Sequence, residues 1–327
     1  VIAGPNYTGV STRPSSSDWG VHGTWMASLI AGHGHDGGLS GVTGTAPAAR
    51  ILSIRVIPDR ADPHYGKYER EKEAVIQQSL ANGIKYAVTH GAKVISMSIG
   101  YSAPSATVRA ELQKAYDHGV VVIASAGNSG GPGSTKHGHP APDSFPADYP
   151  GVISVSAVTA SGTVANFSSD NLSVKVAAPG VKVPAQGRDG QYWLVSGTSP
   201  ACALVAGVAA LIKSKYPRLA PDLVARALTS TTTDRPADGY DSQVGFGIVD
   251  AAAALTKAGR LAGVRPVTTS IKATVRYHGV LPPAPVRPRG SGQLVLFSLL
   301  ALTSLALIAA AGTRLAVLRR AQGRANQ

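Results

Sequence analysis

Short, nearly continuous apolar runs alternate along the chain with longer segments whose apolar residues recur every three or four positions. The runs are rich in valine and isoleucine and do not alternate strictly with polar residues, which is typical of strands buried on both faces of a parallel sheet. The predicted strands are RILSIRV (50–56), AKVISMSIG (92–100), GVVVIASAG (119–127) and GVISVSAV (151–158). The periodic segments at 69–91 and 105–119 both end in glycine and predict helices.

The order of these elements predicts an α/β fold. Strands that alternate with helices form a mostly parallel sheet with helices on both faces, so we expect a three-layer domain. Further helices are predicted near 198–216, 221–231 and 249–257. In such folds binding and catalytic groups gather where strands end and helices begin, so candidate residues are sought at those positions.

The C-terminal part of the sequence differs from the rest in composition. Segment 294–313 (LVLFSLLALTSLALIAAAGT) carries no charge and is long enough to cross a hydrocarbon core of about 30 Å as a helix. A Pro-rich stretch, 261–293, precedes it and predicts an extended linker, and a basic tail, 314–327, follows it. We therefore predict a folded domain over 1–260, a linker, one transmembrane helix and a short tail.

The charges around this segment predict its orientation. The arginines of the tail favour a cytoplasmic C-terminus, although two arginines of the linker weaken the asymmetry. The large domain is then extracytoplasmic, on a single-pass protein of the cell membrane. A buried core helix is the alternative, disfavoured because little polypeptide follows to cover it. Such a protein needs an export signal, and none precedes Val1, so the sequence is expected to be a processed form or a fragment.

Net charge and cysteine content bear on two further classes of protein. The formal net charge is +13, but eleven basic residues and no acid lie after Asp250, so residues 1–250 carry only +2. No nucleic-acid-binding face is therefore predicted for the folded domain. The single cysteine, Cys202, excludes an intrachain disulfide and is interpreted as a small buried packing residue rather than a thiol nucleophile.

Three polar residues fall where predicted strands and helices meet. His22 opens the apolar helical segment HGTWMASLIAG, Asn128 follows a predicted strand in SAGNSG, and Ser199 lies early in SGTSPACALVAGVAALI. Taken singly, each has an ordinary structural interpretation, as a histidine at a helix start, a turn asparagine and a helix-capping serine. Together, in one α/β domain, they favour a base, an oxyanion donor and a nucleophile.

These motifs, together with GVTGTAPAARILSIRV and VISMSIG, resemble the subtilisin-like serine proteases, peptidase family S8, over about residues 15–257. The resemblance implies a three-layer subtilisin-like fold and a serine endopeptidase that works through an acyl-enzyme. The C-terminal anchor and the stretch ASLIAGHGHDGG are more narrowly similar to the mycosins, which are associated with type VII secretion in actinobacteria. The expected partners are a protein or peptide substrate, the membrane and the type VII secretion machinery, with no nucleic acid.

The resemblance also implies roles for individual residues. Ser199 is expected to be the nucleophile and His22 the general base, with Asn128 and the backbone N–H of Ser199 as the oxyanion hole. The segment Ser98, Ile99 and Gly100 matches the family's substrate-binding strand. Gly127 is expected to leave room for the substrate side chain that precedes the cleaved bond.

The third member of the expected triad, an aspartate, has no match in the sequence. Subtilisins carry it before the histidine, at the end of the first sheet strand, whereas the only acid before His22 here is Asp18. The position of Asp18 favours a helix cap or a turn carboxylate, with an unusual triad acid as the alternative. The aspartate is therefore expected upstream of Val1, and the chain by itself is expected to be impaired in turnover.

Two further interpretations concern metals and activity. The stretch GHGHDGG holds His33, His35 and Asp36, but this spacing in a glycine-rich loop is a weak metal signature, so no metal and no cofactor are predicted. The alternative to a protease is a catalytically inactive structural or peptide-binding component of a secretion assembly. An aspartate in an Asp-Thr-Gly or Asp-Ser-Gly strand upstream would favour the enzyme.

Overall fold

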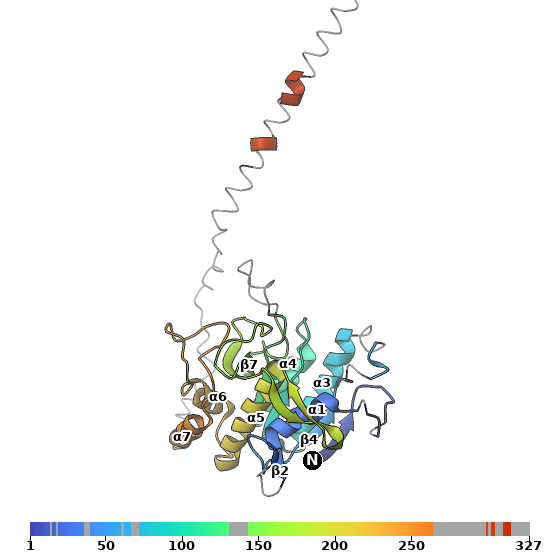
Figure 1. Cartoon of the computed structure of the whole chain (residues 1–327), viewed down its shortest axis with the longest axis vertical. Coiled ribbons are helices and arrows are strands. Elements are labelled where there is room, and N and C mark those ends of the chain that lie inside the picture. The colour runs from blue at the N-terminus through green and yellow to red at the C-terminus, as the bar shows by residue number, and fades with distance from the viewer. Residues whose placement is uncertain are drawn as a thin grey trace, which may run out of the picture. The chain divides into compact units, whose positions relative to one another are not determined.

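The computed structural model covers the folded part of the chain and short pieces of its C-terminal region. The residues it describes are 1–13, 15–17, 19–35, 40–59, 62–66, 72–130, 143–263, 299, 302–304 and 310–314. The chain divides into two units, Val1–Pro266 and Val267–Gln327. The first unit is an α/β domain, drawn with its elements labelled in Figure 1.

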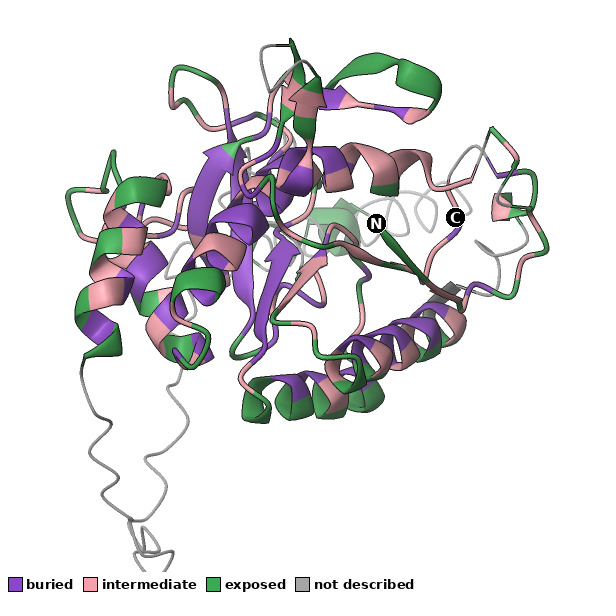
Figure 2. Ribbon diagram, turned by 90° about the horizontal axis from the view of Figure 1, so that it is seen from below, coloured by how far each residue is buried: buried purple, intermediate pink, exposed green. Residues whose placement is uncertain are grey.

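Four parallel strands form the centre of the α/β domain. In spatial order they are β5 (Val94–Met97), β6 (Val121–Ser125), β7 (Ile153–Val158) and β8 (Val174–Pro179). β6 and β7 are buried along their whole length, as the purple strands of Figure 2 show. The strands predicted from the apolar runs are therefore confirmed, whereas β8 was not anticipated from the sequence.

Helices cover both faces of this sheet. Side chains alternate along β6: Val121 and Ile123 join the core under one helical layer, while Val122 and Ala124 join the core under the other. The first layer contains α5 (Thr198–Lys215), α6 (Pro221–Thr229) and α7 (Ala251–Ala262), and the second contains α3 (Lys72–Thr89) and α4 (Ala106–Asp117). The predicted three-layer arrangement with a parallel sheet is confirmed.

Smaller sheets surround the central one. β1 (Ile2–Asn6) pairs in parallel with β4 (Leu52–Arg55), and among the described residues this pair shares no hydrogen-bonded neighbour with the four-stranded sheet. The antiparallel pairs are β2 (His33–His35) with β3 (Ser40–Thr43), and β9 (Val183–Gln186) with β10 (Tyr192–Val195). Helix α1 (Val21–Ala31) packs on α5 through a small apolar cluster that includes Met26 and Leu29.

Two predicted strands are less buried than their apolar sequences indicate. Along β4 every described side chain is partly or fully exposed, and along β5 only Met97 is buried. Both strands are edge strands, since β4 pairs only with β1 and β5 only with β6 among the described residues. The expectation that both strands lie buried is therefore wrong in this structure. Each strand is more exposed because it has a described strand partner on one side only.

A buried carboxylate fixes the outer end of β4. The Asp62 side chain accepts hydrogen bonds from Thr12 Oγ1 at 2.6 Å, Arg55 Nη2 at 2.8 Å and the His64 N–H at 2.9 Å. The Arg55 guanidinium also lies 4.1 Å from the centre of the Trp19 ring. These contacts join the segment before α1 to β4 and to the loop after it.

The predicted membrane segment at 294–313 lies mostly outside the described residues, as do most of the predicted linker and tail. Residues 299, 302–304 and 310–314 are helical. Within the part of the chain that the structure describes, no helix has the length and apolar character needed to cross a bilayer.

Candidate active site

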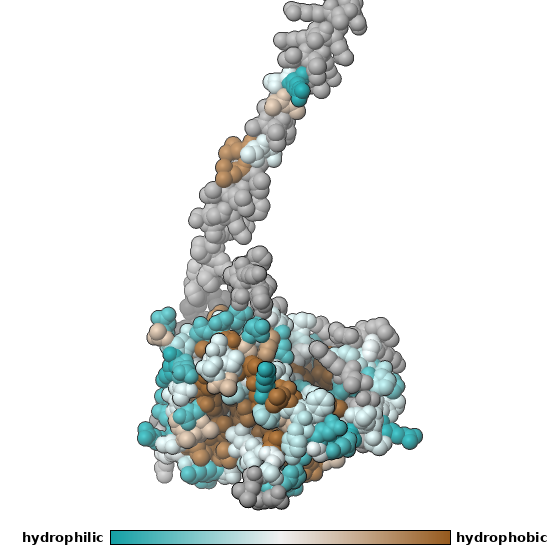
Figure 3. Space-filling view, in the orientation of Figure 1, coloured by the Kyte–Doolittle hydropathy of each residue, from teal (hydrophilic) through white to brown (hydrophobic). Residues whose placement is uncertain are grey.

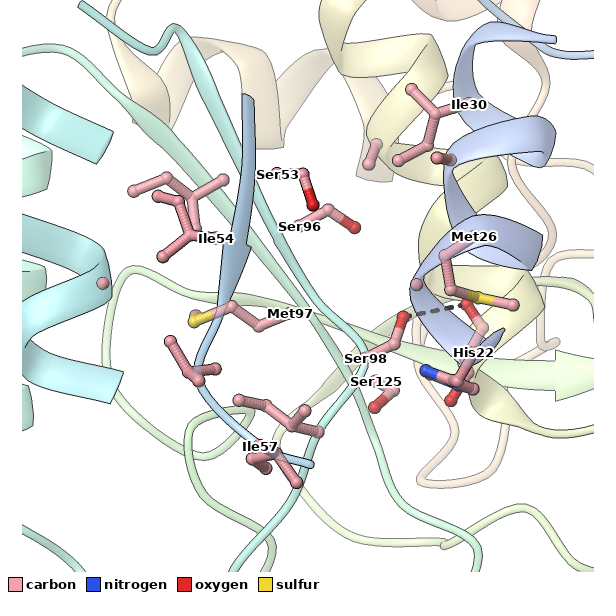
Figure 4. Close-up of a pocket in the computed structure, with 18 of the residues that line it drawn as sticks. His22, Met26, Ile30, Ser53, Ile54, Ile57, Ser96, Met97, Ser98 and Ser125 are labelled. Atoms are coloured by element: carbon pink, nitrogen blue, oxygen red, sulfur yellow. Dashed lines mark hydrogen bonds between the residues drawn. The ribbon is translucent and has the colours of Figure 1, made fainter. Parts of the chain in front are cut away.

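One cavity of about 2160 Å³ brings together every site residue predicted from the sequence. The residues in question are His22, Ser98, Ile99, Gly100, Gly127, Asn128 and Ser199. They come from α1, from the segments that follow β5 and β6, and from the start of α5. In Figure 4, His22 and Met26 on α1 lie across the cavity from the strand that carries Ser96, Met97 and Ser98.

Ser199 lies in the first turn of α5, where it is partly exposed. The helix begins after Gly197, whose φ of 150° is a conformation that side chains other than glycine rarely adopt. Pro200 follows at an early helical position, where its missing N–H removes no helix hydrogen bond. Ser98 Oγ donates to the Ser199 carbonyl at 3.1 Å, which ties the turn to the segment after β5. The hydroxyl is thereby held at the positive end of a long helix.

Asn128 is oriented by the residue next to Ser199. Its Oδ1 accepts from the Thr198 N–H at 2.8 Å and from Thr198 Oγ1 at 3.0 Å. Because a backbone N–H can only donate, these bonds identify the amide oxygen, and the NH₂ group points away from Thr198. Gly127 N–H donates to the same hydroxyl at 3.2 Å. The donor of Asn128 is therefore fixed relative to the start of α5, as electrostatic stabilisation of an oxyanion requires.

His22 is placed by a carboxylate that the sequence analysis did not identify. Asp59 accepts hydrogen bonds from the Gly20 N–H at 2.8 Å and from the His22 N–H at 2.9 Å, at the start of α1. Asp59 thus satisfies two N–H groups at the start of α1. Asp18, for which a helix cap or a turn carboxylate was predicted, lies outside the described residues. The signal for Asp59 was its place just after a predicted strand. The His22 ring also meets the Trp25 ring edge to face, with centroids 6.4 Å apart.

Two predicted glycines of the cavity wall lie close to serine hydroxyls. A Cβ added at Gly100 would lie 2.8 Å from Ser144 Oγ, and one at Gly127 would lie 2.8 Å from Ser169 Oγ and 3.2 Å from Ser144 Oγ. Gly127 also has φ 107°, which favours glycine. Ser144 lines the cavity and was not predicted, because it lies far from the other site residues in sequence.

Comparison with known proteins decides the family. The family model described as Peptidase_S8, the subtilase family, matches residues 3–247. The chain belongs to the subtilase family. This subtilase is 34% identical to subtilisin DY of Bacillus licheniformis over 78% of the chain and 84% of that protein. It is 35% identical to subtilisin E of Bacillus subtilis over 71% of the chain and 56% of that protein, so it spans little more than half the length of some curated relatives.

Solved structures agree with this assignment. MycP1 with its N-terminal propeptide removed is 29% identical, with a TM-score of 0.64 over 77% of the subtilase and 84% of that chain. Another MycP1 structure, described as an essential component of the type VII (ESX-1) secretion system, is 33% identical, with a TM-score of 0.59 over 72% of each chain. Its family and its relatives show that this subtilase is a serine endopeptidase.

Two other groups were weighed as candidates, the Cys202 thiol and the GHGHDGG stretch. Cys202 is fully buried, and burial raises the pKa of its thiol to about 11, so it stays protonated at neutral pH. His33 Nδ1 lies 3.1 Å from the Ala31 carbonyl, and Asp36 is outside the described residues. The part of the chain that the structure describes contains no group of three metal-ligating side chains.

Proposed function

We propose that this subtilase hydrolyses peptide bonds through an acyl-enzyme, with Ser199 as nucleophile and His22 as general base. His22 takes the hydroxyl proton as Ser199 Oγ attacks the carbonyl carbon, and the negative charge develops on the carbonyl oxygen. Asn128 and the Ser199 N–H donate to that oxygen. His22 then protonates the leaving amine, and water releases the acyl group by the same steps in reverse.

The orientation of Asn128 is the observation that supports this chemistry most strongly. Its oxygen is held by Thr198, one residue before Ser199, so the NH₂ donor and the nucleophile belong to one hydrogen-bonded unit. A turn asparagine with no chemical role needs no such link to a residue seventy positions later in the chain. A donor that is already oriented stabilises charge in the transition state without a reorganisation cost.

The proposed substrate is an extended peptide. The segment from Ser98 to Gly100 continues β5 past its last residue and lines the cavity, so it can pair with a peptide main chain. The space beside Gly100 and Gly127, bordered by Ser144, is proposed to hold the side chain before the cleaved bond. Because the two glycines lie close to the Ser144 and Ser169 hydroxyls, a small substrate side chain is favoured there.

We also propose that the catalytic domain works on the outer face of the cell membrane, as part of type VII secretion. The charge-free segment 294–313 and the arginines that follow it support the anchor and the cytoplasmic C-terminus. The likeness to MycP1, which is described as part of a type VII secretion system, supports the partner. Protease digestion of intact cells tests the location, because only an external domain is degraded.

Hydrolysis of an activated peptide ester by the full chain in mild detergent tests the chemistry. Such an ester needs little help with its leaving group, so its rate depends mainly on the nucleophile and the oxyanion donor. Ser199→Ala is expected to abolish hydrolysis. Asn128→Ala is expected to lower kcat by about 10²–10³, a magnitude measured for the corresponding donor in subtilisin itself.

The matched control is Ser161→Ala, at an exposed loop serine, which is expected to leave the rate unchanged. Retention of activity in Ser199→Ala would contradict the proposal. A folded wild-type chain that binds peptides but hydrolyses no ester would instead indicate a catalytically inactive, peptide-binding component.

A further inference from the structure

Three consecutive large apolar side chains are exposed in the strand that leads to Ser199. Along β10, Tyr192 is 51% exposed, Trp193 48% and Leu194 67%. Among the described residues β10 pairs only with β9. Figure 3 shows apolar surface on one face of the domain, among polar side chains. Single exposed apolar residues are ordinary, whereas a contiguous exposed group of them marks a binding surface.

This exposed group borders the candidate active site. Trp193 and Leu194 line the same cavity as His22 and Ser199. The Trp193 ring meets the Trp25 ring with centres 5.6 Å apart, and the Trp25 ring meets the His22 ring at 6.4 Å. Rings in contact therefore connect the proposed base to the exposed strand. We call Trp25, Trp193 and Leu194 the tryptophan patch.

Hydrogen bonds hold the β9–β10 hairpin against α1 and the segment before it. The Gln186 N–H of β9 donates to Ser28 Oγ of α1 at 3.0 Å. In the turn of the hairpin, Arg188 Nη1 donates to the Trp19 carbonyl at 2.8 Å. Because both ends of the hairpin are fixed in this way, the tryptophan patch is in place before any ligand binds.

Gly187, at the start of the turn, packs against both indoles. A Cβ at Gly187 would lie 2.8 Å from Trp193 Nε1 and 3.3 Å from Trp25 Nε1, so a side chain there would displace the rings. Trp25 Nε1 is buried and makes no hydrogen bond among the described residues. A buried indole N–H usually has a partner, and its loss costs stability. Local costs of this kind are typical of positions kept for function.

The chemistry of His22 determines which part of a substrate meets the tryptophan patch. In the proposed mechanism His22 protonates the leaving amine, so that nitrogen comes within about 3 Å of the imidazole. The residue that carries this nitrogen is the first one after the cleaved bond. Its side chain then lies within reach of Trp25, whose ring centre is 6.4 Å from that of His22.

We propose that the tryptophan patch selects substrates with a large apolar side chain, aromatic above all, on the first residue after the cleaved bond. This inference rests on the proposed function. Indole faces accept a further ring with centres about 4.5–7 Å apart, whereas a charged side chain there would lose water without gaining a partner. A second copy of the chain is a poorer occupant, because Trp25 and Trp193 line a cavity rather than a projecting face.

Acyl transfer to added amines measures this preference separately from the acyl half of the substrate. The activated peptide ester first acylates Ser199. A free amine then attacks the acyl carbon, the bond from that carbon to Ser199 Oγ breaks, and His22 carries the amine proton to Oγ. Water competes and gives the free acid. The ratio of new peptide to acid, at one amine concentration, therefore reports how well each amine binds beside His22.

Phenylalanine amide should give a peptide-to-acid ratio at least about tenfold above that of glycine amide, because it buries one large apolar side chain. Aspartate amide should do no better than glycine amide. Trp193→Ala should reduce the advantage of phenylalanine over glycine at least about threefold, and Trp193→Phe should keep most of it. The advantage compares two amines within one variant, so a general loss of activity does not change it.

Tyr116→Ala is the matched control, at an exposed aromatic residue of α4 that does not line the cavity, and should leave the advantage unchanged. Gly187→Ala should lower it as Trp193→Ala does, because the added Cβ displaces both indoles. Equal ratios for the two amides, or an advantage that survives Trp193→Ala, would overturn the proposal. A dimer in sedimentation that Leu194→Asp dissociates, without any preference among amines, would instead assign the patch to a second copy.

Binding of leaving-group peptides separates this inference from the proposed function. A folded chain that hydrolyses no ester would contradict the proposed chemistry, yet the amides of Phe-Ala-Ala and Gly-Ala-Ala can still be titrated against it. Trp25 and Trp193 line the cavity, so intrinsic fluorescence reports binding, and Trp25 remains as reporter in Trp193→Ala. We expect the phenylalanine peptide to bind at least about fivefold more tightly, a difference that Trp193→Ala removes. Equal binding of both peptides would overturn the selection by the patch whether or not the chain is active.

Discussion

Replacing Asp62 by asparagine removes the charge that fixes β4 beside the site. The carboxylate is fully buried and pairs with Arg55, whose side chain is itself 9% exposed. Burial alone raises the pKa of Asp62, but hydrogen bonds from Thr12, His64 and Arg55 outweigh it and lower the pKa from 3.8 to about 2. The carboxylate form is therefore favoured in the folded state.

The size of the effect follows from that pKa. A lowering of nearly two pKa units corresponds to about 2 kcal/mol of folding free energy at 25 °C. Because the folded pKa lies below the unfolded one, this stability is fully present above about pH 5 and is lost as the pH falls through 4 toward 2. Asparagine also leaves the Arg55 guanidinium with a weaker acceptor, so the total cost at pH 7 is expected to be about 2–4 kcal/mol.

Urea unfolding of the wild type and of Asp62→Asn between pH 7 and pH 2.5 measures the contribution of Asp62 to the free energy of unfolding. We expect the difference in unfolding free energy to be largest at pH 7 and to shrink toward pH 2.5. Asp117→Asn, at an exposed position of α4, is the matched control and should change stability by less than about 0.5 kcal/mol. A difference for Asp62→Asn that stays constant with pH, or that is no larger than the control, would refute the reasoning.

Three further substitutions probe the site. Gly197→Ala forces a side chain into a φ of 150°, 3.3 Å from Asn128 Nδ2, and should lower ester hydrolysis at least tenfold while circular dichroism stays unchanged. Asp59→Ala removes both acceptors at the start of α1 and should cost about 1 kcal/mol in urea unfolding, with slower hydrolysis because His22 is less well held. Burial raises the pKa of Asp148, so its charged form destabilises the folded state at pH 7. Asp148→Asn keeps an acceptor for the Ser144 N–H and should therefore unfold at a higher temperature than the wild type at pH 7. This difference should disappear on acidification.

The elements around the site could be predicted because their signals are local. The apolar period and the Pro200 position predicted helix 198–216, and the structure has α5 at Thr198–Lys215. The strand before Asn128 was predicted in the same way, whereas the strand predicted over 92–100 ends earlier, at Met97, so that Ser98 follows it. That these residues line one cavity follows from the general rule that strand ends meet at one edge of a parallel sheet.

The features that were missed depend on contacts between distant segments. Asp59 binds the start of α1 from thirty-seven positions away, and its place just after a predicted strand did not reveal that partner. Ser144 lines the cavity from a separate loop. The apolar sequence of β4 predicted a strand covered on both sides, and its exposure became visible only in the structure, where β1 is its one strand partner among the described residues.

Reaction of the full chain with a fluorophosphonate probe, followed by mass-spectrometric mapping of the modified residue, tests the central claim most directly. We expect the label on Ser199, slower labelling in His22→Ala, and no labelling in Ser199→Ala. A folded chain with no label at Ser199, or with equal labelling of exposed serines such as Ser161, would contradict the account.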